Sequence, residues 1–379
     1  MLRALCTTAV LLLLCAVHAA ASTWIVDVNG TGHYITIGGA VGASAVASGD
    51  TLLVRPGTYT GSMNRWIDFA GKELVIRSSD GPASTVIDCE EQGTAFWFHS
   101  QELPDATVEG LTIANGRAPY GGAFFIEQES SCTVRDCVIQ DCEATSGDGG
   151  GINCEDDSHV YVYNTTFKDN RAQSYGGGAM IWGGSAIFQG CHFEGNHGIT
   201  TGGGLFIFWG ADALIDSCTF VRNTAYYYGG GMMINQATAI VEDCTFFANT
   251  AGVGGSFRGG GIYCHECSPT IVRNIISHSY YGNGIDCSEA ADPQISHCDI
   301  FANAHGDSLC GTHWDNLFED PLYCDPTSED LSLCEDSPCL PEGNDWGVTM
   351  GGIGQGCGPC GTGAANLEAS WGLIKALFR

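Results

Sequence analysis

A short repeat built around clusters of glycine constrains this chain more than any other feature of its sequence. Gly triplets begin at residues 149, 176, 202, 229 and 259 and a Gly pair begins at residue 121, so the steps between clusters are 28, 27, 26, 27 and 30 residues. Between the clusters runs a second signal, which reads "TTFKDN", "CHFEGN", "CTFVRN", "CTFFAN" and finally "CDIFAN". A unit of this length cannot bury a core alone, so the repeat predicts stacked units, that is, a solenoid.

The spacing of apolar residues within each unit identifies the kind of solenoid. After each glycine cluster, apolar residues stand two positions apart, as Leu205 and Ile207 do. This is the period of a strand with one face toward a core, and no period of 3.6 accompanies it. We therefore predict an all-β, single-stranded parallel β-helix whose coils stack about 4.8 Å apart.

Two columns of like side chains should then run along the rod. Stacking places equivalent residues above one another, which brings together the Phe residues of the second signal and, three positions further on, its Asn residues. Asn suits this position because it tolerates a tight bend and its amide can bond to the next Asn. The predicted columns are Phe167, Phe193, Phe220 and Phe246, followed by Asn170, Asn196, Asn223, Asn249 and Asn303.

The "GGAF" at 121–124, the later "GGG" units and the F-x-x-N units resemble the repeats of the polymorphic outer-membrane protein family. That family belongs to the pectate-lyase-like superfamily of right-handed parallel β-helices. The segment "SGDTLLVRPGTYTG" (48–61) also resembles the first coil of many such secreted proteins. The resemblance covers residues 24–358 and implies a right-handed helix. It implies no single function, because the same scaffold carries lyases, hydrolases, adhesins and inert surface proteins.

The ends of the chain differ from the repeat and suggest five segments. The first residues combine one Arg, an apolar run and small residues before position 22, which is typical of a secretory signal peptide. We therefore expect a secreted or cell-surface protein, extracellular or associated with an outer membrane, with no transmembrane segment after the signal. The predicted segments are a signal peptide (1–21), an N-terminal cap (22–50), β-helix coils (51–303), a disulfide-rich C-terminal cap (304–358), and a linker with a short tail (359–379).

Cysteine usage fits export. The chain has 20 Cys, and removal of Cys6 and Cys15 with the signal peptide leaves 18, an even number that favours disulfide bonds. Cys264 and Cys287 fall in one column on successive coils, close enough for a disulfide. In the column of Cys191, Cys218 and Cys244 only one adjacent pair could close. The predicted pairs are Cys264–Cys287, Cys310–Cys324 and Cys339–Cys357.

Charge narrows the list of partners. A net charge of −29 opposes nucleic acid and anionic membrane surfaces, so we expect no nucleic-acid partner. No cofactor is predicted, with Ca²⁺ as the one ion that the acidic "EDD" at 155–157 would suit. The candidate ligands are Asp148, Asp156 and Asp157, and the alternative is a solvated acidic turn.

Large apolar residues also occupy positions that should face outward. They alternate with the inward residues of the strand after each glycine cluster, so stacking would join them into one aromatic strip. Such a strip often marks a binding surface. Alternatively, loops that include "TAYYY" (224–228) fold over the strip and bury it. The predicted ligand-binding residues are Phe125, Met180, Trp182, Phe206, Phe208, Met233 and Tyr263.

Three functional hypotheses follow. The first is a non-catalytic secreted or surface protein that adheres to or binds carbohydrate or a surface protein through the aromatic strip. The second is a polysaccharide lyase or glycoside hydrolase, and the third is a purely structural surface protein. No catalytic residue is predicted, because no basic residue recurs on a strand face and the hydrolase pattern of Asn-Thr-Asp and Gly-His-Gly does not occur. A set of carboxylates with one Arg or Lys along a groove would favour the enzyme.

Overall fold

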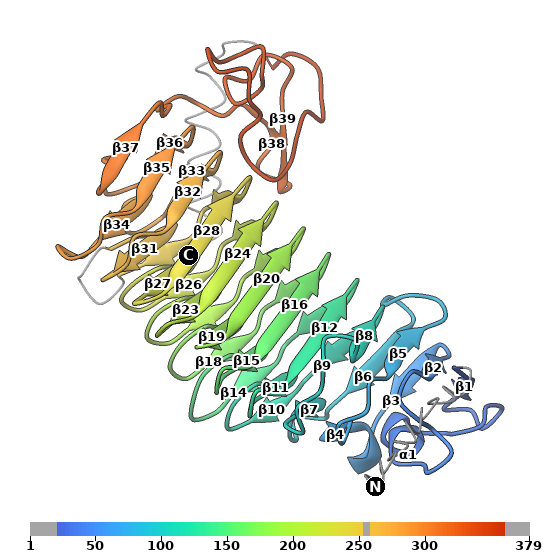
Figure 1. Ribbon diagram of the computed structural model, residues 1–379. Coiled ribbons are helices and arrows are strands. Elements are labelled where there is room, and N and C mark those ends of the chain that lie inside the picture. Colours follow the sequence, from blue (N-terminus) through green and yellow to red (C-terminus); the bar gives the residue numbers. More distant parts are fainter. Residues whose placement is uncertain (1–20, 253–257, 361–379) are drawn as a thin grey trace, which may run out of the picture.

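The computed structural model describes residues 21–252 and 258–360, and they form a rod of right-handed parallel β-helix (Figure 1). In the middle coils the chain passes through four strands that belong to four different sheets, and toward both ends of the described rod the fourth strand is missing. Each strand pairs in parallel with its equivalents in the neighbouring coils. Almost all of the predicted signal peptide (1–21) and of the tail (359–379) lies outside the described residues.

Sheets A and B run along two sides of the rod. Sheet A consists of β1 (Thr23–Val26), β2 (Thr51–Val54), β5 (Val75–Ser78), β8 (Thr107–Glu109), β12 (Ser131–Arg135), β16 (His159–Tyr163), β20 (Ser185–Gln189), β24 (Asp212–Asp216), β28 (Thr238–Glu242), β32 (Thr270–Val272), β35 (Gln294–Ser296) and β37 (Thr312–Trp314). Sheet B consists of β3 (Gly57–Tyr59), β6 (Thr85–Asp88), β9 (Thr112–Ala114), β13 (Val138–Gln140), β17 (Thr166–Lys168), β21 (His192–Glu194), β25 (Thr219–Val221), β29 (Thr245–Phe247), β33 (Ile275–Ser277) and β36 (Asp299–Phe301).

Sheets C and D complete the rod. Sheet C consists of β4 (Ile67–Asp68), β7 (Phe96–Phe98), β11 (Phe124–Ile126), β15 (Ile152–Cys154), β19 (Ala179–Trp182), β23 (Leu205–Phe208), β27 (Met232–Asn235), β31 (Ile262–His265) and β34 (Ile285–Cys287). Sheet D consists of β10 (Arg117–Ala118), β14 (Glu143–Ala144), β18 (Arg171–Ala172), β22 (His197–Gly198), β26 (Thr224–Ala225) and β30 (Thr250–Ala251). The remaining elements are α1 (Ile37–Val41), the 3-10 helix η1 (Ser62–Asn64) and the antiparallel pair β38 (Tyr323–Asp325) and β39 (Asp330–Leu333).

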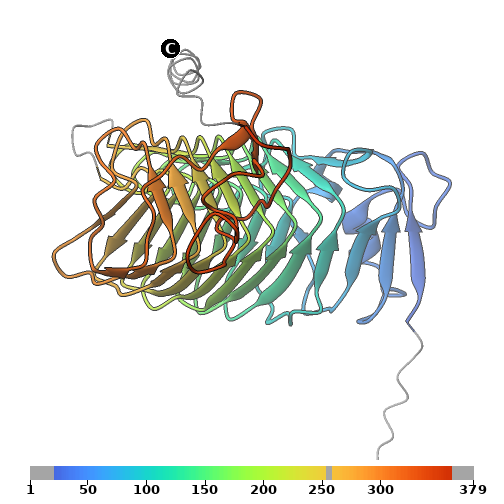
Figure 2. The ribbon, with the colours of Figure 1, turned by 90° about the horizontal axis from the view of Figure 1, so that it is seen from above.

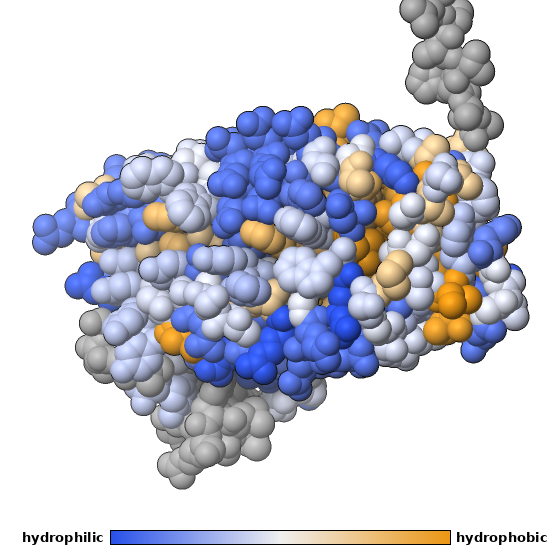
Figure 3. Space-filling model, turned by 90° about the horizontal axis from the view of Figure 1, so that it is seen from below, coloured by the Kyte–Doolittle hydropathy of each residue, from blue (hydrophilic) through white to orange (hydrophobic). Residues whose placement is uncertain are grey.

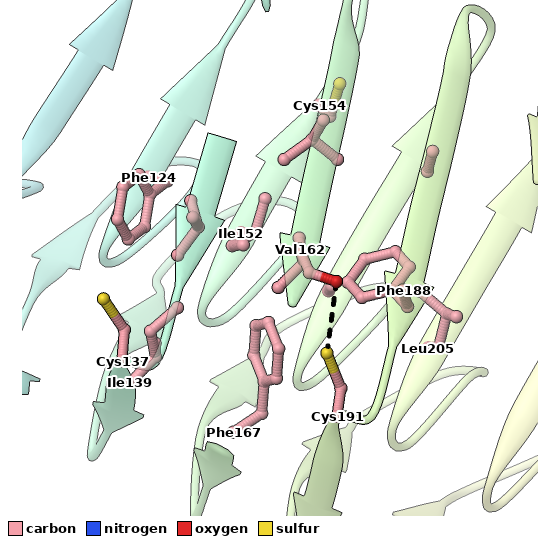
Figure 4. Close-up of a cluster of buried hydrophobic side chains, with 14 of the residues drawn as sticks. Phe124, Cys137, Ile139, Ile152, Cys154, Val162, Phe167, Phe188, Cys191 and Leu205 are labelled. Atoms are coloured by element: carbon pink, nitrogen blue, oxygen red, sulfur yellow. Dashed lines mark hydrogen bonds between the residues drawn. The ribbon is translucent and has the colours of Figure 1, made fainter. Parts of the chain in front are cut away.

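One continuous hydrophobic core fills the rod from end to end. Its centre is the predicted Phe column, in which the rings of Phe167, Phe193, Phe220 and Phe246 stack with centroids 4.5, 4.6 and 4.6 Å apart and planes within 3° of parallel. Figure 4 shows side chains from sheets A, B and C pointing into this core. The spacing of the rings matches that of strands in a sheet, so the predicted fold is confirmed.

From Asn170 to Asn249 the predicted Asn column is a hydrogen-bonded ladder at the corner after sheet B, whereas Ser279 occupies the next coil and separates Asn303 from it. The Oδ1 atom of Asn196 accepts hydrogen bonds from the backbone N–H and the Nδ2 of Asn170, at 3.1 and 3.0 Å. The Nδ2 of Asn196 donates in turn to Asn223 and to the carbonyl of Phe167, both at 2.9 Å. Because these side chains are buried, each amide satisfies backbone groups that would otherwise lose their hydrogen bonds to water.

The glycine clusters serve two purposes. The first glycine of the triplet at 229 has a φ of +62°, in the left-handed region that favours glycine. The third is needed because coils approach closely there: a Cβ on Gly231 would lie 2.7 Å from the carbonyl oxygen of Gly261 and 2.8 Å from the ring of Phe246. The repeat therefore marks a corner of each coil where a side chain has no room.

The sheets extend beyond the predicted coil segment, 51–303. At the N-terminal end β1 already pairs with β2, and at the other end β37 pairs with β35. The short helix α1 lies in the segment expected to form the N-terminal cap, where Ile37, Ala40 and Val41 are buried. None of the helices among the described residues is long and apolar enough to cross a membrane.

The residues that follow the last coil do not lie across the end of the rod, as a terminal cap would. They pack against the outer face of sheet B, where Phe247 and Ile275 meet Tyr323, Leu333 and other apolar residues in a second, separate cluster. Figure 2 shows this segment lying along the coils. Gly351 donates to the carbonyl of Arg273 at 2.8 Å, so the contact includes the backbone. We call residues 320–360 the flanking segment.

The predicted disulfide pairs are wrong, although disulfides do gather near the C-terminal end. The bonds observed join Cys287 to Cys310, Cys324 to Cys357 and Cys334 to Cys360. Cys264 is in register with Cys287 but stays a buried free thiol next to Cys267. Side chains in register on a parallel sheet point the same way, whereas a disulfide needs the two Cβ atoms to point toward each other. Cys339 instead donates from Sγ to a carboxylate oxygen of Asp299 at 3.3 Å.

The even number of cysteines was also misleading, since twelve of those described are buried free thiols. Cys191, Cys218 and Cys244 lie at the corner before sheet B, where no pair closes. The sulfur of Cys218 accepts the backbone N–H of Cys191 at 3.4 Å and donates to the carbonyl of Phe188 at 3.3 Å. Burial raises the pKa of the Cys218 thiol well above its usual range, which keeps the S–H proton needed for donation. These thiols therefore form a second ladder, with the role that Asn has at the next corner.

Candidate functional site

The predicted aromatic strip lies on the outer face of sheet C, in strands β19, β23, β27 and β31. Their registers align two rows of outward side chains. We define the inner row as Met180, Phe206, Met233 and Tyr263, and the outer row as Trp182, Phe208, Asn235 and His265. Both rows project outward because they alternate with Ile181, Ile207, Ile234 and Cys264, which belong to the core.

The inner row is covered. Its four side chains are no more than 4% exposed and form a small cluster separate from the core of the rod. The cover comes from tyrosines that precede the glycine clusters. The ring of Tyr175 lies 5.1 Å from that of Phe206, and Tyr228 stacks on Tyr263 with centroids 4.8 Å apart. The alternative in which "TAYYY" folds over the strip therefore describes the inner row.

The outer row is open to solvent at its N-terminal end. The Trp182 side chain is 45% exposed, and its ring lies 5.8 Å from that of Phe208. Phe208 is half-buried between Trp182, Phe206 and the exposed Trp209. Phe125 continues the strip toward the N-terminus, where it is half-buried and stacks on Tyr120 at 6.0 Å.

A groove of about 310 Å³ separates the covering tyrosines from the outer row. Two polar atoms at the groove lack partners: the Oγ1 of Thr201 and the Oδ1 of Asn235 are buried and accept or donate no hydrogen bond. Thr201 is only 6% exposed, so its hydroxyl has lost water without gaining a protein partner. The lining residues are Tyr175, Thr200, Thr201, Phe206, Phe208, Tyr228, Met233, Asn235, Tyr263 and His265.

The cationic side chain of Arg258 lies at the C-terminal end of the groove, next to Tyr263. Burial raises the pKa of the Tyr263 phenol, and the nearby Arg258 opposes this shift through a hydrogen bond and its charge. The same hydrogen bond raises the pKa of Arg258. Asp286 is the next residue of this outward column, and burial raises the pKa of its carboxyl group.

Three carboxylate groups lie at the N-terminal end of the aromatic strip. Glu127, Glu155 and Asp156 can each bring an oxygen within 4.8 Å of the other two. Burial raises the pKa of Glu155, and the charges of Asp156 and Glu127 add to the shift. Of the three metal candidates from the sequence, Asp156 is in this cluster. Asp148 and Asp157 are not part of it: Asp148 accepts the backbone N–H of Tyr175 at 3.1 Å, and burial raises its pKa to about 6.

Two segments of the chain, residues 94–260 and 200–319, match the family described as "Right handed beta helix region", and together they span more than half of its length. The chain belongs to the right-handed β-helix family. The repeats that resemble those of the polymorphic outer-membrane proteins remain a prediction within it. No curated protein matches the chain.

Two solved structures are similar to this β-helix. One, "Crystal structure of pectate lyase Pel9A", has 11% sequence identity and a TM-score of 0.44, covering 89% of this chain and 97% of that one. The other, "Crystal structure of pectin methylesterase in complex with hexasaccharide VII", has 11% identity and a TM-score of 0.22, covering 76% and 80%. Likenesses this distant concern the fold and say nothing about the site of this β-helix.

The charged groups of this β-helix do not assemble into one centre. Arg258 precedes β31 and Glu155 follows β15, and four strand spacings separate these coils, or about 19 Å along the rod. A catalytic acid and a catalytic base must both reach the same part of a substrate, and a separation of about 19 Å prevents Arg258 and Glu155 from doing so. Glu127 was not among the sequence candidates, although it occupies the same outward column as Glu155 and Trp182, and that column was the signal for it.

Proposed function

We propose that this protein is exported, is secreted or displayed at the cell surface, and binds carbohydrate through the groove on sheet C without catalysing a reaction. One observation carries the proposal: the exposed rings of Trp182 and Trp209 lie beside Phe208, which lines a groove in which buried polar atoms lack partners. A role in adhesion would follow if the carbohydrate belongs to another cell or a matrix.

The groove offers both kinds of contact that a sugar requires. A sugar ring has apolar C–H faces, which pack on aromatic rings such as those of Trp182, Phe208 and Trp209. Its hydroxyl groups need partners at fixed places, and Thr201 Oγ1 and Asn235 Oδ1 each provide one. The coils repeat about every 4.8 Å, so a chain of sugars lying along the rod would meet Trp182 and Phe208 first and then the polar Asn235 and His265.

Charge favours a neutral or basic carbohydrate. The net charge of −29 repels acidic chains at long range, and the carboxylates at one end of the strip repel them locally. Arg258, which bonds to the Tyr263 hydroxyl, lies at the opposite end. We therefore expect neutral or amino-sugar glycans to bind more tightly than uronates.

A lyase or hydrolase is the second candidate, favoured by the position of Arg258 next to the Tyr263 hydroxyl and near Asp286. The distance of about 19 Å between this group and the carboxylate cluster is the reason it stands second. A purely structural role accounts for the covered inner row but not for the unpartnered Thr201 hydroxyl.

The test is a glycan array with the mature protein, followed by affinity measurements on W182A and W314A. Trp314 is a matched control, since it is 46% exposed but lies in β37 of sheet A, away from the groove. Stacking of a nucleic-acid base on one aromatic ring is worth about 1–3 kcal/mol, and by analogy we expect W182A to weaken binding at least about fivefold and W314A to leave it unchanged. Equal losses in both variants, or no bound glycan, would contradict the proposal. Unsaturated or shortened sugar products would point to the enzyme.

A further inference from the structure

The carboxylate cluster on sheet C is built by the pairing of two coils. β11 and β15 are in register, with Phe125 opposite Asn153 and Ile126 opposite Cys154. The residues that follow these strands, Glu127 and Glu155, are therefore neighbours, and Asp156 comes directly after. The cluster is thus fixed by backbone pairing and not by chance contacts between long side chains.

The contacts of the three carboxylates leave their charge uncompensated. Glu127 accepts a hydrogen bond from the indole nitrogen of Trp97 at 2.9 Å, and Glu155 accepts one from the Nδ2 of Asn153 at 3.0 Å. Both donors are neutral. Over the described part of the chain, the ion pairs of Lys, Arg and His go to other acidic groups and not to these three. Three negative groups within 4.8 Å repel one another unless a cation lies among them.

The Asn153 side chain is a separate observation that points to a cation. Asn153 lies between the inward Ile152 and Cys154, so its amide projects toward the outer face and reaches Glu155. The residue is fully buried, and its Oδ1 has no hydrogen-bond partner. A buried amide oxygen without a donor is costly. A metal ion would coordinate this oxygen, and its positive charge would also offset the repulsion among the neighbouring carboxylates.

We propose that Glu127, Glu155, Asp156 and the Oδ1 of Asn153 bind a calcium ion. The donors are all hard oxygens, with no His nitrogen or Cys sulfur in the set, which selects Ca²⁺ or Mg²⁺ over zinc and copper. Carboxylates from a strand end and from Asp156, whose φ is +56°, form an irregular set. Calcium accepts such a set with six to eight oxygens, whereas magnesium demands a near-ideal octahedron. The proposal does not depend on carbohydrate binding.

Terbium luminescence tests the site directly, because Trp97 touches Glu127 and can transfer excitation energy to a bound Tb³⁺ ion. The mature protein, stripped with chelator, is titrated with Tb³⁺ while indole is excited, and the signal is then competed with Ca²⁺ or Mg²⁺. We expect saturable luminescence that Ca²⁺ displaces at concentrations at least about tenfold lower than Mg²⁺. Signal without saturation, or equal displacement by Mg²⁺, would overturn the assignment to calcium.

Two variants separate a site from general attraction to an acidic surface. E155Q removes one proposed ligand, whereas D157N removes the same charge from a residue outside the cluster. We expect E155Q to weaken Ca²⁺ binding at least about tenfold and D157N to weaken it less than about twofold. Thermal unfolding adds a sign test that does not need luminescence: in chelator E155Q should melt at or above the wild-type temperature, because repulsion is relieved, and the shift caused by Ca²⁺ should vanish. Equal effects of the two substitutions would refute the site.

Discussion

The coils from β12 to β33 are held by stacked rings, by Asn and thiol ladders and by one core, and their cysteines stay reduced. The flanking segment, residues 320–360, has one short antiparallel pair and a small apolar contact with sheet B, and it contains two disulfides. The difference shows what a repeat provides. Each coil forms its backbone hydrogen bonds with equivalent strands in the coils on both sides. The flanking segment has no such neighbours, so covalent links supply the constraint.

If the coils depend on stacked side chains, removing one ring should have the largest effect. We expect F220A to lower the free energy of unfolding by about 3–5 kcal/mol, because Phe220 is fully buried and stacks on Phe193 and Phe246. Chemical denaturation followed by circular dichroism measures this. A loss below 1 kcal/mol would mean that neighbouring coils close the gap and that stacking is not what holds the rod.

Breaking the link between Cys324 and Cys357 should act on the flanking segment alone. We expect the double variant C324S/C357S to destabilise that segment by about 2–4 kcal/mol, because the disulfide closes a loop of 33 residues. Hydrogen exchange should show protection lost in residues 320–360 and kept in β12–β29. Loss of protection throughout the rod would contradict the division into two differently stabilised regions.

Removing one Asn side chain of the ladder should lower the free energy of unfolding less than removing one Phe ring of the core. In N223A the backbone N–H of Asn196 and the carbonyl of Phe193 lose their partners. We expect a cost of about 1–3 kcal/mol, typical of a buried group left unsatisfied. The matched control is N29A, at an exposed turn, which should change the free energy of unfolding by less than about 0.5 kcal/mol. If N223A and N29A lower the free energy of unfolding equally, the Asn ladder does not stabilise the rod.

The contact between the two regions should respond to pH. Burial raises the pKa of Asp299 to about 7, from an ordinary value of 3.8. Because the folded-state pKa is the higher one, the stabilisation is fully present below about pH 4 and is lost as pH rises toward 7. The slope is at most about 1.4 kcal/mol per pH unit. Thermal unfolding of the flanking segment between pH 4 and 8 measures it, and D299N should flatten the curve. A wild-type curve as flat as that of D299N would contradict the assignment.

The smallest effect is expected at the outer row. W182A should change the free energy of unfolding by about 0.5 kcal/mol or less, since the ring is half exposed and outside the core. Y228A, which uncovers the buried Tyr263, should cost more. Denaturant midpoints of the two variants measure the contrast. A larger loss in W182A than in Y228A would mean that Trp182 contributes to packing rather than to an open surface.

The stacking of the rod could be predicted because it depends on residues that recur. The Phe and Asn columns and the outward direction of Phe206 and Trp182 all follow from a repeat of known period. The position of the flanking segment could not be predicted, since residues 320–360 contain no repeat to align. The Cys264–Cys287 pair failed because column position gives the distance between two cysteines but not the direction of their side chains. The other two pairs failed because they involve the C-terminal segment, where no repeat gives a register.

The site could be predicted in part. The sequence placed the aromatic residues on one face, but whether they are covered depends on how Tyr175 and Tyr228 bend before their glycine clusters. Those tyrosines do follow the repeat, since Tyr175, Thr201 and Tyr228 each precede a glycine triplet and pair in parallel, but the period does not say which way their rings bend. The carboxylate cluster was missed although Glu127 and Glu155 share one outward column, because the sequence candidates come from neighbours within one turn and not from the coil before, which β11 brings alongside β15.

The register of the coils also bears on how such a protein can change its length. Within the rod each coil pairs with the one before and the one after, through the same backbone pairs and the same ladder positions. An in-frame duplication of residues 205–231 would therefore insert a coil whose two faces already fit both neighbours. It would add one ring to the Phe stack, one Asn and one thiol to the ladders, and one further pair of aromatic positions to the groove. The reach of the binding surface can thus grow in evolution by copying a single segment of DNA, without any new residue having to be selected.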